Sequence, residues 1–231
     1  MEALRWRQTI CPVEKISTQA AYIQVLGGIA GAFITPYRAG EIPARVAMLS
    51  NTAVMPQAIA LGIYGSLIMT AVVVASGMVP ALFWLQGSMT VVVLYSVAAL
   101  VLTVAFGFGI RHYASRHKEL DMPVGSVVLY SFLRYCCFSL QLYLMLIAVG
   151  IELSVVQALV AIPTYYALVT ISPNMPVADL GLRGSWAVFV FSRYSSAAPS
   201  VALAAGAMWV VNSVLPLVFS LPFVLRGRKS R

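Results

Sequence analysis

Charged residues are scarce in this chain. Only 10% of its 231 residues are Asp, Glu, Lys or Arg, whereas soluble domains carry about 25%. Hydrophobic residues make up 61% of the chain, and the mean hydropathy is +0.90. Apolar runs of about 20 residues recur, and runs of that length are typical of membrane spans. The composition excludes an ordinary soluble domain and predicts one integral membrane domain over residues 1–231.

Residues that usually carry catalysis are also few. The chain has seven carboxylates, two histidines and three cysteines. No HExxH, GxSxG or P-loop motif occurs, so we expect no enzyme. Cys136 and Cys137 are adjacent within an apolar run and Cys11 lies near the N-terminus, which indicates neither a metal site nor a disulfide framework. The polar residues 1–15 predict no cleavable signal peptide.

The net charge of +8 raises the question of a nucleic-acid partner. The basic residues lie at the ends of apolar segments, where they are typical of topology signals and of contacts with anionic lipid headgroups. We therefore expect lipids, and no nucleic acid, as partners.

Five segments are long and apolar enough to span a bilayer: 54–75, 87–110, 124–149, 153–172 and 199–225. Two further stretches, 18–50 and 173–197, are interrupted by glycine, proline and charge. Broken backbone at membrane depth is tolerated only where protein or a water-filled cavity covers it. The sequence predicts an all-α fold, a polytopic transmembrane helical bundle with two broken or re-entrant helical segments.

The charge pattern leaves the topology of the last segment open. The basic loop 111–123 is predicted to be cytoplasmic, and the basic tail 226–231 should be cytoplasmic as well. Both can hold only if 199–225 is a hairpin broken near Asn212 and Pro216, or if 173–197 crosses the membrane.

The stretch "ITPYRAGEIPARVAML", residues 34–49, concentrates three charges beside two prolines and a glycine. Glu41 and Arg45 are spaced i, i+4 with the acid first, so they attract each other on one helix face. Pro43 suits the first turn of that helix. Together with Arg38, the turn and helix start predict a phosphate site, because arginine binds phosphate oxygens in pairs. The alternative is a cytoplasmic loop with solvated charges.

The stretch "ISPNMPVADLGLRGSWAVFVF" is a weak echo of the first, and its Pro173 lies 137 positions after Pro36. Asp179 and Arg183 would be the counterparts of Glu41 and Arg45. Paired interrupted segments in two halves of a membrane protein indicate a transport site. The alternatives are chance similarity, and a capping role for Asp179 at a helix that starts near Leu180.

Arg134 lies inside an apolar span, where a charge normally faces a partner or a water-filled cavity. Its predicted partner is Glu41 or Asp179. The alternative is that Arg134 extends to the cytoplasmic interface. Four other carboxylates are expected in polar ends or loops: Glu2, Glu14, Glu119 and Asp121.

These residues carry a resemblance. "FITPYRAGEIPARVAML" resembles the Pro, Gly-Glu and Arg signature of the lysylphosphatidylglycerol synthase transmembrane-region family of flippase-like membrane proteins, with Pro36, Gly40, Glu41 and Arg45 in place. "ISPNMPVADLGLRGSWAVF" resembles the second signature of that family. Gly181 and Arg183 match it, and Gly184 stands where the family has glutamate. The resemblance covers residues 5–225.

The resemblance implies a multi-pass protein of a bacterial or archaeal cytoplasmic membrane that moves a lipid or lipid-linked group between leaflets, with no soluble cofactor. Family members usually carry about two more N-terminal spans, so we expect a shortened member or one that needs a membrane partner or a homo-oligomer.

The leading hypothesis is a lipid flippase. Arg38, Arg45 and Arg183 would neutralise the lipid phosphate, because an uncompensated phosphate cannot cross hydrocarbon. Glu41 and Asp179 would orient those arginines or hold a cationic headgroup, and Arg134 would line the path. A second hypothesis is a non-transporting membrane subunit that binds or anchors a lipid-modifying or glycosyltransferase partner. A third is an intramembrane enzyme acting on headgroups.

Overall fold

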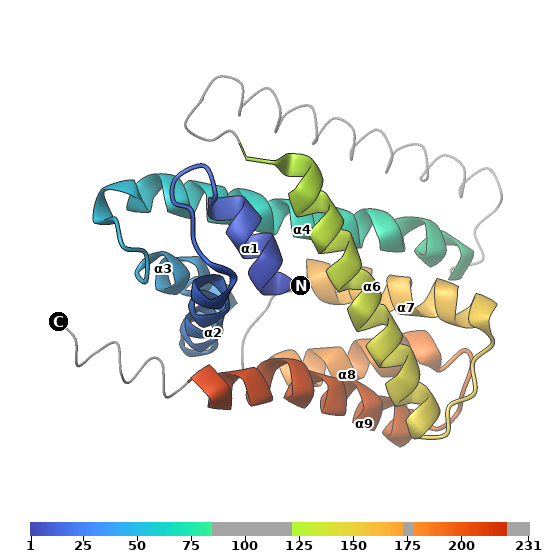
Figure 1. Ribbon diagram of the computed structural model, residues 1–231. Helices are drawn as coiled ribbons and strands as arrows, with labels where there is room; N and C mark the ends of the chain where they lie inside the picture. Colours follow the sequence, from blue (N-terminus) through green and yellow to red (C-terminus); the bar gives the residue numbers. More distant parts are fainter. Residues whose placement is uncertain (85–121, 173–177, 221–231) are drawn as a thin grey trace.

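The computed structural model of the chain, shown in Figure 1, describes residues 1–84, 122–172 and 178–220. These residues form helices and short connections, and none of them is in a strand. The prediction of an all-α fold is confirmed for them. Three helical runs are long and apolar enough to cross a membrane by length and composition: Thr52–Ala81, Val124–Ala148 and Ala198–Ser220.

The α-helices follow one another in two groups separated by residues 85–121, on which the predicted span 87–110 falls. Those residues lie outside the described part of the chain. We call residues 1–84 the first half and residues 122–220 the second half. The helices of the first half are α1 (Glu2–Ile10), α2 (Thr18–Ile34), α3 (Glu41–Val46) and α4 (Met55–Trp84). Those of the second half are α6 (Val124–Ala148), α7 (Val155–Ile171), α8 (Ala178–Phe191) and α9 (Ala198–Trp209).

The predicted span 54–75 begins one residue before α4, which continues to Trp84, and the predicted span 124–149 ends one residue after α6. The predicted span 153–172 coincides with α7, which at 17 residues is shorter than the three long runs.

A hairpin broken near Asn212 and Pro216, one of the two alternatives for the segment 199–225, does not form within the described residues. The chain continues from α9 through a π-helical turn, Val210–Val214, and stays helical to Ser220. Proline has no N–H to donate to the carbonyl of the residue four positions earlier, and a π turn relieves that mismatch. Here the Leu215 N–H donates to the Val210 carbonyl five residues back. The helix accommodates Pro216 without reversing.

The predicted break in residues 18–50 lies between α2 and α3. Tyr37 and Arg38 have φ angles of 54° and 57°, so the backbone turns through the left-handed region and α3 folds back along α2. Gly31 permits this approach, because a Cβ there would lie 2.5 Å from the Gly40 carbonyl oxygen. The local interruption is therefore confirmed as a helical hairpin.

The second half repeats the register of the first. Helices α2 and α7 both have 17 residues, and both their first and their last residues are 137 positions apart, as are Pro36 and Pro173. Each helix follows a serine N-cap, Ser17 or Ser154, whose hydroxyl accepts a backbone N–H three residues on.

The residue that follows each of these helices has a hydroxyl that donates one hydrogen bond and accepts another. Thr35 donates to the carbonyl four residues back over 2.8 Å and accepts from the Gly40 N–H over 2.7 Å. Ser172 donates to the carbonyl four residues back over 2.8 Å and accepts from the Trp186 indole N–H over 2.7 Å. In both halves one hydroxyl thus connects a helix end to the segment that follows.

The halves meet along α4 and α7, which run side by side in Figure 1, while α6 crosses in front of them. Gly77 of α4 lies so close to α7 that a Cβ there would come within 2.4 Å of the Pro163 carbonyl oxygen. Each half has its own apolar core, around Trp6 and Val46 in the first and around Leu142 and Phe191 in the second. The space between these cores holds the polar side chains described next.

Candidate functional cleft

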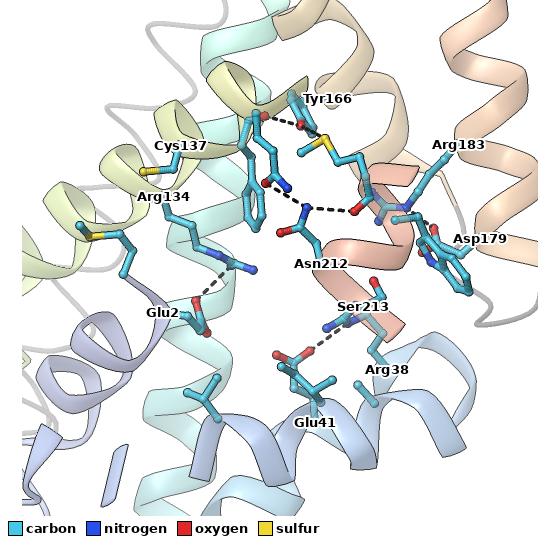
Figure 2. Close-up of a pocket in the computed structure, with 18 of the residues that line it drawn as sticks. Glu2, Arg38, Glu41, Arg134, Cys137, Tyr166, Asp179, Arg183, Asn212 and Ser213 are labelled. Atoms are coloured by element: carbon cyan, nitrogen blue, oxygen red, sulfur yellow. Dashed lines mark hydrogen bonds and ion pairs between the residues drawn. The ribbon is translucent and has the colours of Figure 1, made fainter. Parts of the chain in front are cut away.

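A cleft of about 470 Å³ lies between the halves, a volume in the range of small-molecule sites. Figure 2 shows side chains from both halves converging on it. Glu2 comes from α1, Arg134 from α6, and Asn212 from the helix that continues α9. All six residues predicted from the sequence line this cleft: Arg38, Glu41, Arg45, Arg134, Asp179 and Arg183.

Glu2 is the centre of an ion-pair network in the first half. Its Oε1 accepts from Arg5 Nη2 at 2.7 Å and from Arg45 Nη1 at 2.8 Å. Its Oε2 accepts from Arg5 Nε at 3.0 Å and pairs with Arg134 Nη1 at 3.1 Å. One carboxylate therefore connects α1, α3 and α6. Glu2 lies in the polar N-terminal end, as expected, and its carboxylate reaches the cleft, which the sequence did not indicate.

Glu41 forms the second node of the network. Its Oε1 accepts from Arg45 Nη2, which confirms that the i, i+4 spacing pairs these two side chains. Its Oε2 accepts from Arg38 Nε at 2.9 Å. Arg45 is only 3% exposed, and its guanidinium lies 5.2 Å from the centre of the Trp6 ring. Arg45 is therefore fixed between two carboxylates and an aromatic face.

The network keeps both of these carboxylates ionised. Burial alone would raise the pKa of Glu2, but Arg134, Arg5 and Arg45 outweigh burial and hold that pKa well below its ordinary value of 4.5. Burial opposes ionisation of Glu41 as well, and Arg38 and Arg45 lower the pKa of Glu41. Glu2 and Glu41 are therefore negatively charged at neutral pH.

The second half contributes a simpler pair. Asp179 Oδ1 accepts from Arg183 Nε at 2.9 Å, and Asp179 Oδ2 accepts from the Trp209 indole N–H at 3.1 Å. Asp179 lies in the first turn of α8, which begins at Ala178, and not before a helix that starts near Leu180. The spacing that pairs Glu41 with Arg45 thus pairs Asp179 with Arg183.

The two pairs act on each other across the cleft. Burial alone would lower the pKa of Arg38, but Glu41, Asp179 and Glu2 raise it above its ordinary value. Asp179 belongs to the other half, so its field reaches the hairpin of the first half.

The partner predicted for Arg134 is wrong. Arg134 pairs with Glu2, and neither Glu41 nor Asp179 forms an ion pair with it among the described residues. Its guanidinium also lies 4.9 Å from the centre of the Phe138 ring. Arg134 therefore faces a carboxylate within the protein, as a charge in an apolar helix is expected to do. The spacing of Glu2 and Arg5, three residues apart and beside Trp6, is the sequence signal that could have indicated this network.

An uncharged polar wall, which the sequence did not single out as a site, completes the cleft. Asn212 Nδ2 donates to Gln141 Oε1 at 3.0 Å and to the Met208 carbonyl at 2.9 Å. The Tyr166 hydroxyl donates to the Phe138 carbonyl at 2.9 Å. Apolar lining residues such as Phe33 stand beside these groups. The cleft is therefore suited to bind a molecule with both a charged and an apolar part.

The described residues contain no group of three or more His, Cys, Asp and Glu side chains that could hold a metal ion. Comparison of the chain with protein-family models, with curated protein sequences and with solved structures found no match.

Proposed function

We propose that the chain is a polytopic membrane protein that binds the polar headgroup of a lipid in the cleft between its halves and moves that lipid between leaflets. The observation that carries the proposal is that both acid–arginine pairs and Arg134 of a 25-residue apolar helix line the same cleft. The two interrupted segments would be the re-entrant parts of the bundle, covered by the long helices.

The physical requirement of lipid translocation supports this function. A charged headgroup cannot pass through hydrocarbon unless fixed protein charges replace its water. The cleft offers arginines held by carboxylates from several helices, so the cost of their burial is compensated before a ligand enters. Apolar residues beside them would accommodate the first carbons of the acyl chains. We further propose that the likeness of Pro36, Gly40, Glu41 and Arg45 to the flippase-like signature reflects membership of that family, in the cytoplasmic membrane of a bacterium or archaeon.

A translocation assay tests the proposal. The purified full chain would be reconstituted into liposomes that contain a headgroup-labelled fluorescent lipid, and a membrane-impermeant quencher would report the label in the outer leaflet. We expect the wild type to make nearly all label accessible. Arg134→Gln should reduce the rate by about tenfold or more, since one lost charge-assisted contact is worth at least that factor. Lys15→Gln, at an exposed position outside the cleft, is the matched control.

Proteoliposomes of folded wild type that expose label no faster than protein-free liposomes would rule out lipid transport. If Arg134→Gln transports lipid at the wild-type rate, the lipid does not pass through this cleft. If transport is absent and a stoichiometric membrane enzyme co-purifies with the chain, the second hypothesis, a non-transporting subunit, replaces the first.

A further inference from the structure

We propose that the cleft selects a phosphate headgroup whose other substituent is uncharged, such as phosphoglycerol, and discriminates against headgroups that carry an ammonium group. This inference rests on the proposed function, in which the ligand is a lipid headgroup, and it names the charge class of that headgroup. The count of engaged acceptors and open donors in the cleft supports it.

Each carboxylate oxygen in the cleft already accepts from a protein donor. Glu2 receives four guanidinium contacts, two on each oxygen. Glu41 receives one on each oxygen, and Asp179 receives Arg183 on one oxygen and Trp209 on the other. Each of these carboxylates is already balanced by at least one arginine. An ammonium group that reached one of them would share its oxygens with these donors and would lie beside their positive charge.

The arginines, by contrast, retain open donors. Within the described residues, Arg38 and Arg183 each use Nε toward a carboxylate, and no terminal nitrogen of either pairs with a carboxylate. The Arg183 side chain also hydrogen-bonds Tyr165, and Arg134 pairs with Glu2 through Nη1. The side chains of these three arginines are 24–39% exposed, in contrast to the enclosed Arg45. Terminal N–H groups of Arg38 and Arg134, and those of Arg183 that Tyr165 does not engage, are thus available to a ligand in the cleft.

The way these guanidinium groups are held favours phosphate. A carboxylate on Nε fixes the plane of the guanidinium and leaves the edge formed by the two terminal nitrogens open. Two parallel N–H donors on such an edge match two oxygens of one phosphate. Arg38 and Arg183 present this arrangement from opposite halves, and Arg134 lies in the same cleft. One phosphate group could therefore be bound from both halves.

The net charge points the same way. The network that lines and supports the cleft contains five arginines and three carboxylates: Arg5, Arg38, Arg45, Arg134 and Arg183 with Glu2, Glu41 and Asp179. An anion lowers the electrostatic energy of this set, whereas an ammonium group raises it. The Phe138 ring presents an aromatic face of the kind that attracts cations, and the Arg134 guanidinium already lies against it.

The uncharged wall fits a hydroxyl-bearing substituent. Gln141, Asn212 and Ser213 line the cleft and offer amide and hydroxyl groups with no charge. Glycerol or sugar hydroxyls can exchange hydrogen bonds with these groups, because amides and hydroxyls both donate and accept. A second charged group beside the phosphate has no partner on this wall.

Lipid competition measured by native mass spectrometry tests the inference. The full chain in detergent would be mixed with equal amounts of phosphatidylglycerol, phosphatidylethanolamine and phosphatidylcholine. We expect phosphatidylglycerol to be retained about tenfold or more over the two zwitterionic lipids. Arg38→Gln and Arg183→Gln should each abolish the preference, whereas Lys15→Gln, which removes the same charge from the molecule, should keep it.

Water-soluble headgroups separate recognition of the phosphate from attraction to the lipid surface. Glycerol phosphate should displace bound phosphatidylglycerol, and phosphoethanolamine should not. Equal displacement by both, or equal retention of the three lipids by the wild type, would overturn the inference without recourse to any variant.

The translocation assay keeps the two proposals distinguishable. Transport of phosphatidylethanolamine as fast as phosphatidylglycerol would overturn the selectivity and leave the transport function standing. Selective binding of phosphatidylglycerol without any transport would overturn the transport function and leave the selectivity standing.

Discussion

The two halves of the molecule contain the same acid–arginine spacing and stabilise it in different ways. In the first half, Glu41 and Arg45 belong to a network with Glu2 that spans three helices, and Arg45 is almost fully enclosed. In the second half, Asp179 pairs with Arg183 and accepts one further bond from Trp209. The first pair encloses its arginine, which is 3% exposed, while the arginine of the second pair is 24% exposed.

This difference suggests a division of labour within one cleft. The Glu2 and Arg45 pair of the first half would hold rigid charges, whose positions are set by the ion pairs that connect α1 with α3 and α6. The second half would supply a guanidinium that adjusts to the ligand. Four experiments, by substitution or by change of pH, test this contrast.

Removing the charge of Glu2 should have the largest effect. Glu2→Gln leaves three arginines without their shared carboxylate, and breaking a buried ion pair on one side costs about 3–5 kcal/mol. Asp179→Asn should cost less, about 1–3 kcal/mol, because it leaves one partly exposed arginine without its carboxylate instead of three. Chemical unfolding in detergent measures both, with the exposed Glu152→Gln as control. Equal losses in both halves would contradict the contrast.

Acidification should weaken the first half. The pKa of Glu2 and that of Glu41 are lowered in the folded protein, so their contribution to stability is complete above the ordinary value of 4.5. It is lost as pH falls below 4.5 through the folded-state pKa values. Thermal unfolding in detergent should therefore be insensitive to these two groups between pH 8 and about pH 5 and should move to lower temperature at more acidic pH. The acid sensitivity should be weaker in Glu2→Gln, and an unchanged profile would argue against the network.

Substitutions of Gly31, in the α2–α3 hairpin, and of Gly181, in α8, should change the stability of the protein in opposite directions. Gly31→Ala brings a Cβ within 2.5 Å of the Gly40 carbonyl oxygen and should destabilise the protein by about 1–3 kcal/mol. Gly181→Ala meets nothing within 4 Å in α8 and should stabilise it by up to about 1 kcal/mol, because alanine favours helix more than glycine does. The same unfolding assay compares the two. Tolerance of Gly31→Ala would show that α3 does not pack on α2 in this way.

The two hydroxyls that follow α2 and α7 should have similar, small effects. Thr35→Val and Ser172→Ala each remove one donor and one acceptor, and each should cost about 1 kcal/mol. Similar losses would support the equivalence of the two halves. If only one variant loses stability, the likeness of the two halves lies in the positions of their helices and does not extend to the role of these hydroxyls.

Local features of the site could be predicted from the sequence. The i, i+4 spacing alone pairs Glu41 with Arg45 and Asp179 with Arg183, because three to four residues make one helical turn. Pro36 and Gly40 likewise predict the break after α2. These interactions lie within a few residues of chain, where spacing determines contact.

Long-range features could not be predicted in this way. Glu2 and Arg134 are far apart in the chain, and their contact depends on α1 packing against α6. The same holds for the bond between Asn212 and Gln141. A proline inside an apolar run is compatible with either a hairpin or a π turn, and tertiary packing decides between them. The residues that the sequence missed are those whose partners lie on another helix.

The most direct test of the central claim is an experimental structure of the full chain in nanodiscs that contain phosphatidylglycerol. We expect a phosphate within hydrogen-bond distance of both Arg38 and Arg183, with Arg134 beside it. The acyl chains should extend along the apolar residues that line the cleft. A cleft without a headgroup in that lipid, with Arg38 and Arg183 turned away from each other into bulk water, would contradict it.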